Sequence, residues 1–437
     1  MDSAVTSDDL QPLRKGVSDY VKNSSWLLLE HAMRLVVGLL VGVQVARHLG
    51  PVQFGNLSYA LAIVSIAATL SRLGLDSIVV GRLVRSPAAG GAILRTALGL
   101  RLMGAGAAFG FICLLVPWMS SDSKEQIYIV IIAAGLLFQV ADIVDFLYQV
   151  RARNQRTATL RMGQIMISAG LRLVLIWNDA GLLAFVVATL ADQILLATAY
   201  GMLMRAQHDS VRYHFDPLLA RALVAEAGPL FLSSVFVAAY IRIDQILVRH
   251  LLGPEDIGHY VAATNLSELL YFVPTLIASA VFPVLVMAGR DKASRQVRLR
   301  RFLYRALMLF GIVIAATTSV LAPHLIELLY GPRFAPASEV LAIHVWTLVF
   351  VAYAAIFGKV LIGQGQQRIL PILTLIGLVT DIGCLWLLVP TQGLRGAAFA
   401  AVLSHGAIVM ALLALHGPAR TDLVDVLWFG KRSDPSP

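Results

Sequence analysis

Long apolar runs alternate with short polar segments over almost the whole chain. A helix that crosses the hydrocarbon core of a bilayer needs about 20 consecutive, mostly apolar residues. Runs of this length predict about twelve membrane-spanning helices, at residues 25–46, 57–80, 93–116, 127–150, 158–177, 181–204, 226–248, 258–286, 303–329, 338–362, 369–389 and 395–416. We therefore predict an all-α, polytopic membrane protein.

Two segments that lie far apart in the chain have nearly the same sequence. Residues 47–60 read RHLGPVQFGNLSYA, and residues 249–263 read RHLLGPEDIGHYVAA. Each segment lies between two apolar runs and contains Gly-Pro with a second glycine four residues after the proline, which predicts the same tight turn twice. Membrane proteins built from two copies of one unit are usually transporters, with the site between the copies.

A second pair of similar segments supports the duplication. Residues 149–156 (QVRARNQR) correspond to 361–368 (LIGQGQQR), and at the same offset Gly181-Leu182 corresponds to Gly393-Leu394. A polar stretch divides the spans six and six, so the two halves share one orientation and a pseudo-two-fold axis along the membrane normal. The predicted parts are a cytoplasmic N-terminal tail at 1–22, an N-terminal six-helix bundle at 23–204, a cytoplasmic linker at 205–221, a C-terminal six-helix bundle at 222–416 and a cytoplasmic C-terminal tail at 417–437.

The composition agrees with a membrane protein and gives its orientation. The 437 residues are 58% hydrophobic and 14% charged, with a mean hydropathy of +0.76, too apolar for a soluble domain. If both termini are cytoplasmic, 25 of the 35 Lys and Arg residues lie in inner segments or at the inner ends of spans. The outer segments then carry only Arg47, Lys124, Arg249, Arg333 and Arg395. This asymmetry predicts a multi-pass inner-membrane protein with both termini in the cytoplasm, and it explains the net charge of +9 without a nucleic-acid partner.

Several kinds of chemistry have no sequence signature in this chain. It contains no GxxxxGK[ST] motif for a triphosphate and no HExxH motif for zinc. The outer segments are too short to form the active site of a glycan polymerase or ligase. Cys113 and Cys384 lie inside apolar runs, which indicates neither a disulfide framework nor a metal site. We predict no catalytic residue, no cofactor and no metal.

Motifs along residues 20–416 resemble those of the polysaccharide-biosynthesis flippases, which translocate O-antigen and exopolysaccharide repeat units. This family belongs to the multidrug/oligosaccharidyl-lipid/polysaccharide exporter (MOP) superfamily. The matching motifs are Arg47-x-Leu49-Gly50-Pro51-x-x-x-Gly55 and Leu73-Gly74-Leu75-Asp76 in the first half, and Arg242-Ile243-Asp244-Gln245-Ile246-Leu247, Leu252-Gly253-x-x-x-x-Gly258-x-Tyr260, Pro274 with Pro283, Leu329-Tyr330-Gly331-x-x-Phe334 and Gly393-x-x-Gly396-Ala397-Ala398 in the second. Each motif alone is weak, and their order and spacing carry the resemblance.

The resemblance implies two six-helix bundles around a central cavity that opens alternately inward and outward. The implied substrate is a polyprenyl-diphosphate-linked oligosaccharide, whose lipid tail stays in the bilayer. Its implied partners are membrane lipids, a polysaccharide polymerase and export machinery, with possible coupling to H⁺ or Na⁺. The alternatives are a cation-coupled multidrug antiporter of the same superfamily and a membrane glycosyltransferase or ligase. An acidic, aromatic cavity would suit the antiporter, and Arg34 and Arg242 argue against it.

Charged residues inside the first predicted span are the first candidates for the substrate site. An ionisable side chain costs about 2.5–3.5 kcal/mol at the centre of a membrane helix, so it normally faces a partner or water. Glu30 and Arg34 lie one turn apart. One hypothesis places Arg34 in the cavity, where its guanidinium attracts a diphosphate or an acidic sugar. The other is that the two residues only neutralise each other.

The second half supplies the remaining candidates for the cavity and for ion coupling. Asn265 and Glu268 share a polar stripe that suits a cavity, and Arg242 could add a cation there. Pro274, a few residues further on, predicts a kink in that span. Asp244 and Asp381 are candidate sites for H⁺ or Na⁺.

Other ionisable residues in the spans need only local partners. Asp142 and Asp145 are predicted to pair with arginines of the segment 151–161, and Arg172 is predicted to pair with Asp192.

For four further ionisable residues the sequence gives candidate partners or roles. Arg72 and Asp76 lie one turn apart, Lys359 or His405 is a candidate partner for Asp381, and His344 is predicted to be a hydrogen-bonded packing residue.

Overall fold

The computed structural model describes residues 7–151, 154–205, 215–291, 293–363 and 365–415, and every regular element within them is a helix. The chain forms two compact units. The first unit comprises Met1–Leu49 and Ala60–Ala238, and the second comprises Gly50–Tyr59 and Ala239–Pro437. The chain therefore passes from the first unit to the second and back within the first repeated segment, before it enters the second unit again in the middle of a later helix.

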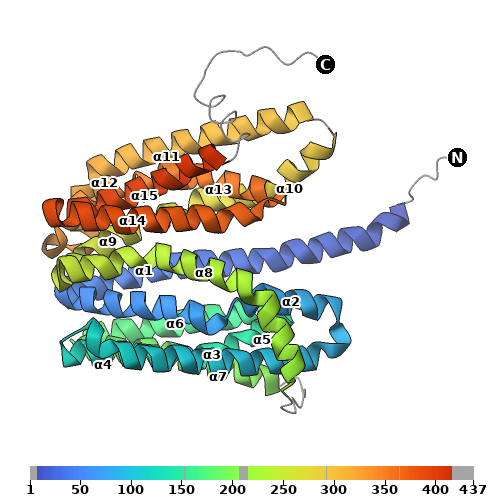
Figure 1. The fold of residues 1–437 in the computed structure, drawn as a ribbon, viewed down its shortest axis with the longest axis horizontal. Coiled ribbons are helices and arrows are strands. Elements are labelled where there is room, and N and C mark those ends of the chain that lie inside the picture. Colours follow the sequence, from blue (N-terminus) through green and yellow to red (C-terminus); the bar gives the residue numbers. More distant parts are fainter. Residues whose placement is uncertain (1–6, 152–153, 206–214, 292, 364, 416–437) are drawn as a thin grey trace. The chain divides into compact units, whose positions relative to one another are not determined.

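In the first half of the chain, the described residues form eight α-helices and two short 3₁₀ turns, and Figure 1 shows their course. These are α1 (Ser7–Arg72), α2 (Leu75–Arg85), η1 (Pro87–Ala89), α3 (Gly90–Met119), α4 (Ser123–Gln139), η2 (Val140–Asp142), α5 (Ile143–Val150), α6 (Asn154–Trp177), α7 (Leu182–Arg205) and α8 (Pro217–Leu251). The α4 and α7 helices pack against each other, as do α3 and α4.

The part of the second half that the structure describes, up to Leu415, contains seven α-helices and two 3₁₀ turns. These are α9 (Pro254–Leu270), α10 (Phe272–Asp291), α11 (Ala293–Tyr330), η3 (Pro332–Phe334), α12 (Ala337–His344), α13 (Thr347–Gly363), η4 (Gln367–Ile369), α14 (Leu370–Gln392) and α15 (Leu394–Leu415). The α14 and α15 helices form an antiparallel pair with the most extensive contact in the structure, and they lie side by side in Figure 1.

The described residues contain 11 helical stretches that are long and apolar enough to cross a membrane. The first, Ser25–Arg85, has 61 residues and contains the non-helical Gly50. At 1.5 Å per residue this stretch is about 90 Å long, enough for two crossings of hydrocarbon about 30 Å thick. The predicted spans 25–46 and 57–80 both lie in it, so the all-α, polytopic architecture with about twelve crossings is confirmed.

The two Gly-Pro turns have similar backbone conformations at their glycines. Gly50 has φ 70° and ψ 171°, and Gly253 has φ 119° and ψ −177°. A residue with a Cβ is strained at such positive φ values, which explains glycine at both positions. The proline that follows occupies the first turn of the next helix, where its missing N–H is not needed. The tight turn predicted for both segments is confirmed.

Several crossings are broken near their middle or their end, mostly without a signal in the apolar pattern. Leu73 and Gly74 both have positive φ and separate α1 from α2. The crossing that contains Pro274 is interrupted at Tyr271, between α9 and α10, three residues before the proline. The α12 and α13 helices are separated by two residues after His344.

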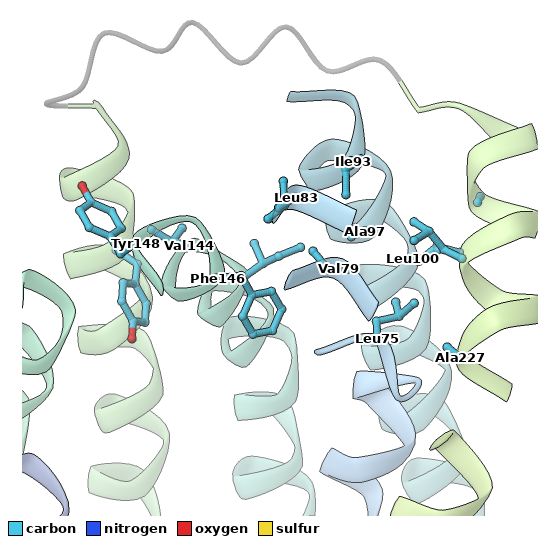
Figure 2. Packing of buried hydrophobic residues seen from close by; sticks show 14 residues of the cluster. Leu75, Val79, Leu83, Ile93, Ala97, Leu100, Val144, Phe146, Tyr148 and Ala227 are labelled. Carbon is cyan, nitrogen blue, oxygen red and sulfur yellow. The ribbon is translucent and has the colours of Figure 1, made fainter. Parts of the chain in front are cut away.

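Each unit has its own apolar core. In the first unit, Leu75 and Val79 of α2 pack with Leu100 of α3 and Phe146 of α5 (Figure 2). Ala227 of α8 belongs to the same core, so the first part of α8 is built into the first unit. A second core lies in the second unit, where α10, α11, α13, α14 and α15 meet.

Candidate functional site

A chain of alternating charges crosses the helices of the first unit. Glu30 accepts two hydrogen bonds from Arg34, with Nη2 at 2.5 Å and Nε at 3.1 Å. Arg161 of α6 lies on the other side of Glu30, with its Nε 3.3 Å from Oε2. Arg161 also donates from Nη1 to Asp145 of α5 at 2.8 Å. Arg161 is the last residue of segment 151–161, so the predicted pairing of Asp145 with an arginine of that segment is confirmed.

Arg34 is the accessible member of this chain of charges. Its side chain is 51% exposed, whereas that of Glu30 is 9% exposed. Glu30 and Asp145 share the two cations Arg34 and Arg161, so the four charges balance. Arg34 therefore presents a guanidinium whose hydrogen-bonding capacity is only partly used, since the group has five N–H donors in a fixed plane.

Two further ion pairs of the first unit join neighbouring helices. The predicted pair of Arg172 and Asp192 is confirmed, with Nη2 2.6 Å from Oδ2 between α6 and α7. The prediction that Arg72 and Asp76 share a helix face is wrong, because the helix breaks between them. Asp76 pairs instead with Arg101 of α3.

Two carboxyl groups are buried in the second unit. Asp244 of α8 is 7% exposed and Asp381 of α14 is 3% exposed, and their charges act on each other. Asp244 accepts a hydrogen bond from the Tyr260 hydroxyl at 2.8 Å and one from the Gln245 backbone N–H at 2.7 Å. One oxygen of Asp381, Oδ1, is buried without any hydrogen-bond partner among the described residues.

No ion pair joins Asp381 to either of its expected partners in the described part of the chain. Lys359 lies over the ring of Phe282, with Nζ 6.0 Å from the ring centre. His405 directs Nδ1 to the carbonyl of Ala401 at 2.8 Å, and its ring packs against that of Tyr240 at 5.4 Å. The sequence places Lys359, Asp381 and His405 on three successive spans. In the structure, Lys359 and His405 have other neighbours than Asp381.

The broken crossings of the second unit meet at polar side chains. Ser267 of α9 and His344 of α12 are hydrogen-bonded at 2.7 Å, so the prediction for His344 is confirmed. Tyr271, at the break between α9 and α10, is hydrogen-bonded to Thr347 at 2.5 Å. Polar groups at helix breaks are typical of ion and substrate sites in transporters, since freed backbone groups also need partners there.

The remaining predicted cavity residues also lie in the second unit. Asn265 is exposed on α9 and Glu268 follows it by three residues, so both lie on one face of the helix. The half-buried Arg242 of α8 is close enough for its charge to act on Glu268 and on Asp244. The structure thus brings Arg242, Glu268 and Asp244 together.

A family model described as polysaccharide biosynthesis protein matches residues 20–288, more than half of the 437-residue chain. The chain belongs to this family. A second family model, MatE, matches residues 229–387. No curated protein matches the sequence. The resemblance drawn from the motifs is confirmed for the polysaccharide biosynthesis family.

Solved structures of the MOP superfamily share the fold of this family member. An inward-facing multidrug resistance MATE transporter has a TM-score of 0.69 at 16% identity, covering 90% of this chain and 95% of its own. The lipid II flippase MurJ in an inward closed conformation has a TM-score of 0.71 at 12% identity, covering 93% and 90%. A MOP superfamily transporter from Pyrococcus furiosus has a TM-score of 0.63 at 16% identity, covering 93% and 96%.

Two residues of this family member that the sequence alone did not single out complete the candidate site. Arg161 was predicted only as one of several partners for Asp142 and Asp145, and its contact with Glu30 of α1 was not predicted. Tyr260 appeared only in a motif, although it holds the buried Asp244. Each partner lies on another helix, and no spacing rule connects residues across helices.

The donor groups of the candidate site suit hard cations or protons better than transition metals. Within the described residues, no cluster of three or more His, Cys, Asp or Glu side chains could hold a metal ion. Asp244 and Asp381 are two carboxyls with hydroxyl groups nearby, and oxygen ligands of this kind prefer hard cations.

Proposed function

We propose that the chain translocates polyprenyl-diphosphate-linked oligosaccharide repeat units across the inner membrane by alternating access, for surface polysaccharide biosynthesis. The translocated units would pass to the polymerase and export machinery on the far side. Membership of the polysaccharide biosynthesis family supports this substrate class. The MurJ structure, which has the same fold, is described as a lipid II flippase, and a lipid-linked substrate also suits a chain built of membrane crossings.

The observation that carries the proposal is the half-exposed Arg34 in the first crossing. Its side chain is half exposed and bonds Glu30 through only Nε and Nη2, so its remaining N–H donors are available to a ligand. A planar guanidinium binds two phosphate oxygens at once. We assign Arg34 to the diphosphate, and Glu30 to holding Arg34 in place. Arg242, Asn265 and Glu268 would contact the sugars, for which a mixed set of charged and amide groups is suitable.

We further assign ion coupling to Asp244 and Asp381. Two buried carboxyls whose charges act on each other are costly unless a cation or a proton joins them. The unpartnered Oδ1 of Asp381 leaves one oxygen available for that cation. Binding of H⁺ or Na⁺ would favour one conformation of the transporter over another and so drive the cycle.

A second candidate function is a cation-coupled multidrug antiporter. The observation that favours it is the match of the MatE family model to residues 229–387, which include Asp244 and Asp381. The accessible Arg34 argues against a cationic drug in the first unit, because like charges repel.

Deletion of the gene distinguishes the proposed flippase from the multidrug antiporter. In a host that makes a surface polysaccharide, we expect the polysaccharide to disappear while lipid-linked repeat units accumulate on the inner leaflet. Complementation with the wild-type gene should restore both. Quantification of extracted lipid-linked oligosaccharide makes the measurement. Normal polysaccharide together with increased sensitivity to cationic drugs would show that the antiporter is correct.

The orientation is tested with reporter fusions. Because most Lys and Arg residues outside the spans lie in alternate segments, we expect fusions at Pro437 and within 205–221 to report a cytoplasmic location. A fusion at Ser121 should report export. Alkaline phosphatase and a fluorescent protein, which are active on opposite sides, provide the two readings. An exported Pro437 would contradict the orientation and the even number of crossings.

A further inference from the structure

An open pocket with polar walls lies within the second unit, where α14 ends and α15 begins. Its volume is about 570 Å³, and it is lined by Glu339, Thr391, Gln392, Leu394, Arg395 and Phe399. Sites for small molecules have volumes of about 300–1,000 Å³ and hold a few polar groups that fix the ligand. In the predicted orientation, the turn between α14 and α15 is an outer segment, so the pocket opens on the extracytoplasmic side.

Packed helix ends hold the walls of this pocket in place. Gly393 separates α14 from α15 with φ 57°, a left-handed conformation that glycine adopts without strain. A Cβ built at Gly396 would overlap the carbonyl oxygen of Leu388, so the two helices meet closely directly after the turn. The α12 helix packs against α15 and contributes Glu339 from its first turn. The pocket is therefore preformed.

One ion pair supplies the charged groups of the pocket. Arg395 donates two hydrogen bonds to Glu339, from Nε to Oε2 and from Nη2 to Oε1, each at 2.7 Å. The side chains of Arg395 and Glu339 are 60% and 53% exposed. This bidentate contact uses only part of the guanidinium's N–H groups and only one lone pair of each carboxylate oxygen. The pair therefore offers free donors and free acceptors side by side.

Donors and acceptors in this arrangement suit neighbouring hydroxyl groups. A hydroxyl both donates and accepts, so one hydroxyl can donate to Glu339 while the next accepts from Arg395. The two charges cancel, which leaves no net attraction for a phosphate. The exposed Thr391 and Gln392 add a hydroxyl and an amide. Phe399, 42% exposed, offers its ring to the C–H face of a sugar. Together these groups match a neutral pyranose.

The first copy of the repeat has apolar residues at the matching positions. At the offset of the second pair of similar segments, Arg395 corresponds to Leu183 and Phe399 corresponds to Val187. Leu183 and Val187 line an apolar pocket between α6 and α7 of the first unit. The fold of the repeat therefore does not require a charge at this place, and an ion pair this exposed contributes little to stability. Its presence in the second copy indicates binding.

We propose that this pocket is an exit-side saccharide site, which binds a neutral sugar of the lipid-linked oligosaccharide after translocation. The site rests on the proposed transport function, which supplies the sugar on this side. It is a second sugar site, in addition to Arg242, Asn265 and Glu268, to which we assigned the sugars during translocation. Its ligand class is a pyranose with two neighbouring free hydroxyls.

Binding of a free oligosaccharide tests the site without any transport. The probe is the repeat-unit oligosaccharide of the host, released from its lipid and diphosphate, and saturation-transfer NMR detects it on the full chain in nanodiscs. We expect Arg395→Gln to raise the dissociation constant about tenfold, because charge-assisted hydrogen bonds are lost. Phe399→Leu should raise it about fivefold through loss of the ring.

The matched control is Arg333→Gln, which removes another exposed arginine of the outer segments that does not line the pocket. This variant should bind the oligosaccharide as the wild type does. Absence of binding to the wild type, or equal dissociation constants for the wild type and Arg395→Gln, would overturn the proposal.

Two further measurements distinguish a saccharide site from an anion site and from a contact that only joins helices. Inorganic pyrophosphate should leave the Arg395-dependent signal unchanged, and displacement of the oligosaccharide would overturn the saccharide assignment. The exchanged pair, Glu339→Arg with Arg395→Glu, keeps an ion pair between α12 and α15 but moves its donors, so it should bind as weakly as Arg395→Gln. Wild-type affinity in the exchanged pair would also overturn the proposal.

The binding measurement requires no lipid, no gradient and no movement of the protein, so its outcome is separate from that of the proposed function. Arg395-dependent binding, together with normal polysaccharide after deletion of the gene, would keep the pocket and reject the transport function. Translocation by a chain that binds the free oligosaccharide equally with and without Arg395 would keep the transport function and reject the pocket.

Discussion

Replacement of Arg34 by alanine should lower the rate of translocation by about ten- to a hundredfold while the protein remains folded in the membrane. A hydrogen bond to a charged group contributes about 1.5–3 kcal/mol, which corresponds to that range. In the variant Arg161 still contacts both Glu30 and Asp145, although one cation then serves two carboxylates. The measurement is the transport rate of a lipid-linked oligosaccharide, with protein abundance determined in parallel.

Two further variants decide what Arg34 contributes. Arg34→Lys should restore little activity if two phosphate oxygens are bound at once, and more if only charge is needed. The double variant Glu30→Gln with Arg34→Gln should stay inactive, because Arg161 retains its pair with Asp145 and only the accessible cation is lost. Full activity in that double variant would show that Arg34 merely neutralises Glu30.

Replacement of Asp381 by asparagine should uncouple transport from the ion gradient. The side chain keeps its size but loses the charge that a cation requires, and the same holds for Asp244→Asn. Wild-type protein should be stabilised in detergent by the coupling cation, by about 2.7 kcal/mol at a hundred times its dissociation constant. Both variants should lose this stabilisation, which is measured as the shift of the unfolding temperature on addition of Na⁺.

The Na⁺ experiment needs a control variant and a test for H⁺ as the coupling ion. Asp122→Asn is the matched control, because Asp122 only caps α4 at the membrane edge and asparagine caps equally well. If H⁺ is the coupling ion, Na⁺ has no effect on the wild type, and transport instead depends on a pH gradient that Asp381→Asn abolishes. Transport by Asp381→Asn that still follows both gradients as in the wild type would exclude these carboxyls as the coupling site.

Unpaired backbone N–H and C=O groups are too costly in hydrocarbon, so a long apolar run that crosses it forms a helix. The apolar pattern therefore predicted the crossings. It could not predict the breaks at Leu73, at Tyr271 and after His344, because a break within a crossing leaves the apolar composition unchanged. Pro274 gave the one usable signal, through its missing N–H.

Ion pairs were predicted only in part. Arg172 and Asp192 lie on consecutive crossings, which made their pairing plausible, and the structure confirms it. Helical spacing placed Asp76 one turn from Arg72, but Asp76 pairs with Arg101 of α3. Contacts between helices depend on their rotation about their axes, which no spacing along one helix records.

The repeated Gly-Pro segments were recognised as a duplication, but their direct contact, of Gly55 with Pro254 and of Gly258 with Pro51, was not foreseen. A repeat in sequence shows that two parts are alike, and does not show that they touch. The second glycine of each copy carried the missing information, since a glycine inside a helix often marks a close approach of another backbone.

Translocation in purified vesicles tests the central proposal most directly. The protein is reconstituted with a polyprenyl-diphosphate-linked oligosaccharide in both leaflets, and an impermeant reagent modifies the sugars that reach the outer leaflet. We predict that the protected pool in the inner leaflet becomes accessible with wild-type protein, and remains protected with Arg34→Ala and in protein-free vesicles. A pool that stays protected with folded wild-type protein, under every imposed ion gradient, would contradict the account.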